Sequence, residues 1–113
     1  MPRWRLVIRH GPRVDQENFD DLDAAVVAME RRSEEIRSEG PLRKVSALRA
    51  YEPGQRVHAR LELSTRGFGW GKEAGIDVMG DGALVPYVGV IRKRRLEPAR
   101  GQSEFDAIRG ALA

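Results

Sequence analysis

The two histidines, His10 and His58, are the first side chains to consider for chemistry, because imidazole acts as metal ligand, base or acid near neutral pH. The chain contains no cysteine, which excludes disulfides, thiol catalysis and cysteine-ligated metal centres. His10 falls on the inner face of one expected strand, and His58 on the outer face of another. The sequence therefore predicts two structural histidines and no metal site.

Other arrangements that support catalysis or ion binding are not evident in the sequence. The stretch DVMGDG, residues 77–82, has the acidic and glycine composition of a calcium loop. Met79 stands where a ligand is needed, however, and Val88 takes the place of the bidentate acid. Ser64 and Thr65 have no evident base, and no pair of carboxylates is specified for acid–base chemistry. We expect a protein that is not an enzyme and that uses no cofactor.

The glycine-aromatic segment 66–72, RGFGWGK, is a candidate contact loop. Phe68 and Trp70 alternate with glycines between Arg66 and Lys72, so the aromatic rings are positioned to stack on bases while the cations meet phosphates. The same rings suit an aromatic anchor for a protein partner. A third interpretation is a long hairpin loop whose aromatic side chains fold back onto the domain.

The opening strand, residues 3–10, carries a second candidate surface. Its alternation places Arg3, Arg5 and Arg9 on the side opposite the apolar residues, and a one-sided basic surface suits phosphate binding. The alternative is an exposed sheet face that is polar only because it meets water.

The pattern of apolar residues predicts an α+β fold in the order β-α-β-β-β-β-α. A helix over 19–41, capped by Asp20, and a short helix that begins after Ser103 are expected from their apolar spacing and capping residues. Runs of hairpins without alternating helices indicate an antiparallel sheet of about five strands with two helices packed on one face. The expected strands cover residues 3–10, 44–52, 57–63, 73–79 and 83–91.

The clearest hairpin covers residues 73–91. We predict a two-residue turn at Asp81-Gly82, a register that pairs Ile76 with Tyr87 and places Tyr87 on the apolar face. A three-residue turn would reverse which side chains of the second strand face the core, so the sequence leaves the register open.

Four consecutive cations follow this hairpin at residues 92–95. If the strand continues through them, Lys93 and Arg95 follow the apolar face, and Arg92 and Arg94 take the other face. They then form no single basic patch, and we interpret them as the solvated exit of a strand.

The composition is that of one small globular domain spanning residues 1–113, with 20 basic and 17 acidic residues and a formal net charge of +3. This small excess of positive charge does not by itself indicate a nucleic-acid partner. No apolar run approaches the roughly 20 residues that span a bilayer, and no secretory signal is evident. We expect a cytoplasmic protein with no membrane contact.

The order of elements is similar to the double-stranded-RNA-binding-like layout of ribosome hibernation factors. The ending GQSEFDAIRGAL, residues 101–112, loosely resembles the final helix of that family. This chain departs from the family in its extra hairpin, its shorter last helix and the loop 66–72. The resemblance transfers no site residue.

Two functions follow as hypotheses. The first is a non-catalytic interaction module that associates with itself, as a homodimer, or with a protein partner through exposed strand edges and the aromatic loop. The alternative is binding of RNA or single-stranded nucleic acid. Its candidate contacts are Arg3, Arg5, Arg9, Arg66, Phe68, Trp70 and Lys72.

Overall fold

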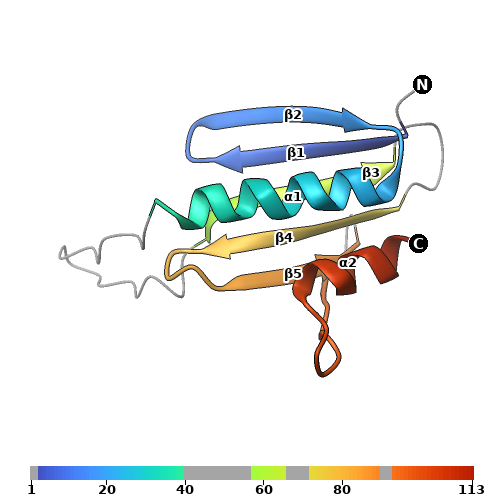
Figure 1. The fold of residues 1–113 in the computed structure, drawn as a ribbon. Helices are drawn as coiled ribbons and strands as arrows, with labels where there is room; N and C mark the ends of the chain where they lie inside the picture. Colours follow the sequence, from blue (N-terminus) through green and yellow to red (C-terminus); the bar gives the residue numbers. More distant parts are fainter. Residues whose placement is uncertain (1–2, 40–56, 66–71, 90–92) are drawn as a thin grey trace.

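A computed structural model describes residues 3–39, 57–65, 72–89 and 93–113 (Figure 1). It confirms the α+β class: one antiparallel sheet of six strands, in the order β2-β1-β3-β4-β5-β6, carries two helices on one face. The strands are β1 (Trp4–His10), β2 (Arg13–Phe19), β3 (Val57–Thr65), β4 (Glu73–Met79), β5 (Leu84–Val88) and β6 (Arg94–Arg95). The helices are α1 (Leu22–Arg37) and α2 (Glu104–Leu112).

The hydrophobic core lies between the sheet and the helices. Alternate residues of β1, β3 and β4 are buried on the side of α1. Figure 1 shows α1 lying along the middle of the sheet, and α2 packs beside it over β4 and β5. The apolar face of the strands, which repeats every two residues, thus packs against the apolar faces of the helices, which repeat every three to four residues. The fully buried residues include Leu6, Ile8, Val26, Met29, Leu61, Leu63, Ile76, Val78 and Ile108.

Strand β2 is an addition to the expected order. It pairs with β1 after a tight turn in which Gly11 takes a φ of 60°, the left-handed region that glycine adopts without strain. Its helix-facing residues Asp15 and Glu17 are charged and contact Arg32 of α1 at 2.8 and 3.8 Å. An edge strand held by ion pairs has no alternating apolar pattern, so apolar alternation does not predict it.

Helix α1 begins slightly later than predicted. Its N-cap is Asp21, whose carboxylate accepts a hydrogen bond from the backbone N–H of Ala24 at 2.7 Å, so the assignment of Asp20 as the cap is wrong by one residue. The helix ends at Arg37. The expected strand over 44–52 lies outside the described residues.

The hairpin of β4 and β5 has the register that the three-residue turn produces. Ile76 pairs with Pro86, and Gly75 pairs with Tyr87, so the predicted pairing of Ile76 with Tyr87 is wrong by one residue. The loop closes with a 2.8 Å hydrogen bond from Met79 N–H to the Ala83 carbonyl. Tyr87 consequently lies on the face of the sheet away from the helices.

The cationic segment turns back instead of extending β5. Strand β6 pairs antiparallel with β5 and places Arg95 opposite Tyr87. The Lys93 ammonium lies 5.0 Å from the centre of the Tyr87 ring. Lys93 and Arg95 therefore lie on the outer face, and the prediction that they follow the apolar face is wrong. Arg94 pairs with Val88 and so lies on the other side from Lys93 and Arg95, as alternation requires, while Arg92 lies outside the described residues.

Candidate functional site

His10, Glu39 and His58 form a cluster at one end of the sheet. The Nε2 atoms of the two histidines are 3.0 Å apart, and His10 Nε2 lies 3.4 Å from a carboxylate oxygen of Glu39. Each residue offers one ligand atom, and these atoms all lie within 4.8 Å of one another. The prediction that the two histidines occupy opposite faces is therefore wrong.

A β-bulge in β3 brings His58 to His10. Val57 pairs with Met79 and Ala59 pairs with Val78, so the step from Val57 to Ala59 matches a single step on β4. His58 is the extra residue, and an inserted residue changes the direction of its side chain relative to regular alternation. The same irregularity leaves Val57 47% exposed, although alternation predicts it to be buried.

Glu39 reaches the cluster from the end of α1. It follows the C-cap residue Ser38, and its backbone N–H donates a hydrogen bond to the Ile36 carbonyl at 3.1 Å. The C-terminal end of a helix carries partial negative charge from its unpaired carbonyl groups. Three elements distant in sequence, β1, α1 and β3, therefore combine two imidazoles, a carboxylate and the negative end of a helix dipole.

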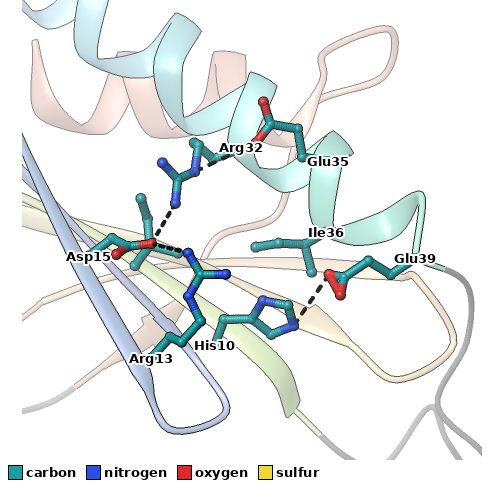
Figure 2. A pocket seen from close by; sticks show the side chains of 8 residues that line it. His10, Arg13, Asp15, Arg32, Glu35, Ile36 and Glu39 are labelled. Atoms are coloured by element: carbon teal, nitrogen blue, oxygen red, sulfur yellow. Dashed lines mark hydrogen bonds and ion pairs between the residues drawn. The ribbon is translucent and has the colours of Figure 1, made fainter.

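A cavity of about 340 Å³ adjoins this cluster. Figure 2 shows the contact of His10 with Glu39 on one side and the contacts among Arg13, Asp15 and Arg32 on the other. Two members of the cluster, His10 and Glu39, thus form part of the cavity wall. The lining residues are Ile8, His10, Arg13, Asp15, Arg32, Glu35, Ile36 and Glu39.

The geometry of the cluster fits a small transition-metal ion. Zn²⁺ binds imidazole nitrogen and carboxylate oxygen at about 2.0–2.2 Å, which places neighbouring tetrahedral ligand atoms roughly 3.4 Å apart. The His10–His58 and His10–Glu39 separations, 3.0 and 3.4 Å, are close to this spacing. The Glu39 side chain is 50% exposed, so it has room to rotate and shorten the remaining separation, between its carboxylate and His58. Three protein ligands leave one of four tetrahedral positions for a further ligand.

Within the described residues, the predicted basic face is neutralised at Arg9 alone, and Arg3 and Arg5 have no acidic partner. Arg5 and Arg9 lie on the outer face of β1, as alternation predicts, while Arg3 is exposed just before the strand. Arg9 donates a hydrogen bond to Glu62 at 2.9 Å. Next to this pair, Arg60 donates two hydrogen bonds to Asp77, at 2.8 and 3.2 Å, which raise the pKa of Arg60.

The candidate residues of segment 66–72 are only partly visible. Arg66, Phe68 and Trp70 lie outside the described residues. The Lys72 ammonium donates to the backbone carbonyls of Leu112 and Ala113 at 3.4 and 3.1 Å, at the C-terminal end of α2. A cation at that position is stabilised by the helix dipole, so Lys72 has a structural role beside the one predicted.

The outer face also holds a buried tyrosine, Tyr87, which the predicted register places on the opposite, apolar face. Tyr87 packs over Gly75, and only 5% of the surface of Tyr87 is exposed to solvent. Its hydroxyl group has no hydrogen-bond partner among the described residues. Burial, then the charges of Glu62 and Asp77, raise the pKa of this hydroxyl, so it stays protonated in ordinary buffers.

Comparisons with protein-family models, with curated proteins and with solved structures found no match. The resemblance to ribosome hibernation factors therefore has no support beyond the order of elements. Neither of the described helices is long and apolar enough to cross a membrane.

Proposed function

We propose that this protein is a non-catalytic binding module that takes up a divalent transition-metal ion, Zn²⁺ or a close neighbour, through His10, His58 and Glu39. The supporting observation is the convergence of the two histidine Nε2 atoms, 3.0 Å apart, beside a carboxylate. Nitrogen and oxygen ligands without sulfur suit zinc, nickel and copper, and calcium and magnesium prefer all-oxygen sites.

The charge around the cluster favours a cation. The cavity lining carries two guanidinium groups and three carboxylates, a formal charge of −1. Arg32 is largely neutralised by Asp15 at 2.8 Å, so its repulsion of an incoming ion is weakened. The end of the helix dipole adds further negative potential.

Isothermal titration of the tag-free chain with Zn²⁺ tests this proposal. The chain has only two histidines and no cysteine, so histidine-dependent binding reports this one site. We expect one ion per chain, and a loss of affinity of at least about 100-fold in His58→Ala, because one of three ligands is removed.

A pair of variants on α1 and just beyond it supplies the control. Glu39→Gln removes a ligand and is expected to weaken binding, whereas Glu34→Gln changes an exposed glutamate that contacts Arg37 and is expected to leave it unchanged. Zinc binding that survives both His10→Ala and His58→Ala would contradict the proposal.

Self-association is a second candidate function, and the position of β2 favours it. In the part of the chain that the structure describes, this seven-residue strand pairs on one side only, with β1. An open strand edge is a template for pairing with another chain. A second copy that pairs through β2 would extend the sheet across a two-fold axis.

Two valines with equal exposure separate this candidate from non-specific association. Val14 on β2 and Val27 on α1 are each 58% exposed. If the chain pairs through β2, light scattering is expected to show a dimer that Val14→Lys weakens and Val27→Lys does not. A wild-type monomer at all accessible concentrations would contradict self-association.

Nucleic-acid binding is retained as the alternative from the sequence, through Arg3, Arg5, Arg9 and the residues of segment 66–72, although Arg9 already donates a hydrogen bond to Glu62. It predicts binding of labelled single-stranded RNA that weakens steeply with added salt. Fluorescence anisotropy at two salt concentrations tests it, and salt-insensitive or absent binding would contradict it.

A further inference from the structure

We infer that the cavity beside the metal cluster binds a small monoanionic carboxylate, held at once by the ion and by Arg13. This inference rests on the proposed metal site. It names the ligand that would occupy the open coordination position, and it derives from the charge, the donors and the size of the cavity.

Loading the cluster reverses the charge of the cavity. Its lining carries two guanidinium groups against three carboxylates, a formal charge of −1. A divalent ion changes this to +1, which a single negative charge neutralises. The empty cavity therefore favours a cation, and the loaded cavity favours a monoanion over a dianion such as hydrogen phosphate.

Of the two arginines in the cavity wall, Arg13 has the N–H donors that carboxylates engage less closely. Its side chain is 74% exposed, and within the described residues its contact is with Asp15, at 3.5 Å. Arg32, in contrast, is 23% exposed and holds the same carboxylate at 2.8 Å. Arg32 thus fixes Asp15, while the planar fork of Arg13 remains able to bind a carboxylate with two parallel hydrogen bonds.

The cavity has the size and lining of a site for a small molecule. Its volume of about 340 Å³ is at the lower end of the range for ligand pockets. Ile8 and Ile36 line the cavity beside the charged groups, and Figure 2 shows Ile36 among them. A carboxylate with a short alkyl group would place its oxygens between the ion and Arg13, and its carbon chain against these isoleucines.

Calorimetric titration with sodium acetate tests the inference. The tag-free chain is used in chloride-free buffer, with and without bound Zn²⁺, because chloride competes for the ion. We expect acetate to bind the zinc-loaded chain and not the metal-free chain. Arg13→Gln is expected to weaken acetate binding about tenfold, the loss of a charge-assisted bidentate contact.

Arg95→Gln is the matched control, since Arg95 is 68% exposed and lies on β6, at the opposite edge of the sheet from β2. Equal binding of acetate by the metal-free chain, or no effect of Arg13→Gln, would overturn the carboxylate site while leaving the metal site intact. Displacement of acetate by an equal concentration of sulfate, which is a dianion at neutral pH, would overturn the choice of a monoanion. Failure of Zn²⁺ itself to bind would overturn the proposed function, and this inference with it.

Discussion

At the scale of single residues, the outer face of the sheet depends on a glycine. A methyl group at Gly75 would overlap the Tyr87 ring and would lie 2.7 Å from the backbone carbonyl oxygen of Leu61. The carbonyl belongs to β3 and cannot move without disturbing its pairing with β4. We expect Gly75→Ala to lower the free energy of unfolding by about 1–3 kcal/mol, measured by urea denaturation.

Gly110 provides the opposite case in the same assay. A Cβ atom added there meets nothing within 4 Å, and the residue lies inside α2. Gly110→Ala is expected to stabilise the protein by about 0.5–1 kcal/mol, because alanine loses less backbone entropy in a helix. Equal effects of the two substitutions would contradict the packing of Tyr87 over Gly75.

The contribution of Glu73, on the outer face of the sheet, to the stability of the fold depends on pH. Burial, and then the nearby charge of Glu62, raise the pKa of Glu73 above its ordinary 4.5. Between the unfolded and folded pKa values the folded chain binds more protons, so the contribution of Glu73 to stability falls as pH rises through that window.

Replacing Glu73 with an uncharged residue removes this loss. We expect Glu73→Gln to raise the melting temperature by about 2 °C at pH 7 and to change it little at pH 4. Circular dichroism at both values measures the effect. Glu97, whose side chain is 83% exposed, is the control, and an equal rise in Glu97→Gln would contradict the explanation.

At the scale of secondary-structure elements, two adjacent aspartates at the start of α1 have different roles. Asp21 accepts the capping hydrogen bond from Ala24, while Asp20 precedes the cap. We expect Asp21→Ala to lower the free energy of unfolding by about 1 kcal/mol, because it leaves a helix N–H group without its side-chain partner. Asp20→Ala keeps that bond and is expected to cost at most a few tenths of this amount, measured by thermal unfolding.

Elements also explain which strands the sequence predicted. Strands β1, β3 and β4 each bury alternate residues on the helix side, which the sequence shows directly, and β4 also buries Gly75 beneath Tyr87. The polar strand β2 is held by backbone pairing and by ion pairs with α1, whose Arg31 and Arg32 lie in a different part of the sequence. Its existence depends on a neighbour that a local pattern does not contain.

At the scale of the whole molecule, a bound ion would tie together β1, β3 and the end of α1. Because an ion that binds only the folded chain stabilises it by mass action, Zn²⁺ at 100 times its dissociation constant adds about 2.7 kcal/mol. For a domain of this size we expect the melting temperature to rise by about 10 °C. The measurement is thermal unfolding of the tag-free chain, and His58→Ala is expected to abolish the rise.

Calcium serves as the control ion, since the cluster lacks the six to eight oxygen ligands that calcium takes. An equal rise with Ca²⁺, or a rise that persists in His58→Ala, would show that the stabilisation comes from elsewhere on the chain.

The sequence by itself determined the fold class. Apolar spacing of two residues in strands and of three to four in helices defines which faces must be buried, and packing those faces together produces an antiparallel sheet with helices on one side. The same spacing predicted the buried residues of β1, β3 and β4 and the outer position of Arg5 and Arg9. These features depend on local pattern alone.

Only the tertiary structure decided the candidate site. His10 and His58 meet because one extra residue in β3 changes the direction of the His58 side chain. The alternation of apolar and polar residues in VHARLEL does not reveal this bulge. The hairpin register likewise depends on one residue in its turn, which moves Tyr87 from one face to the other. A single inserted residue reverses a side chain's face in a sheet, so contacts between strands decide what the pattern within one strand cannot.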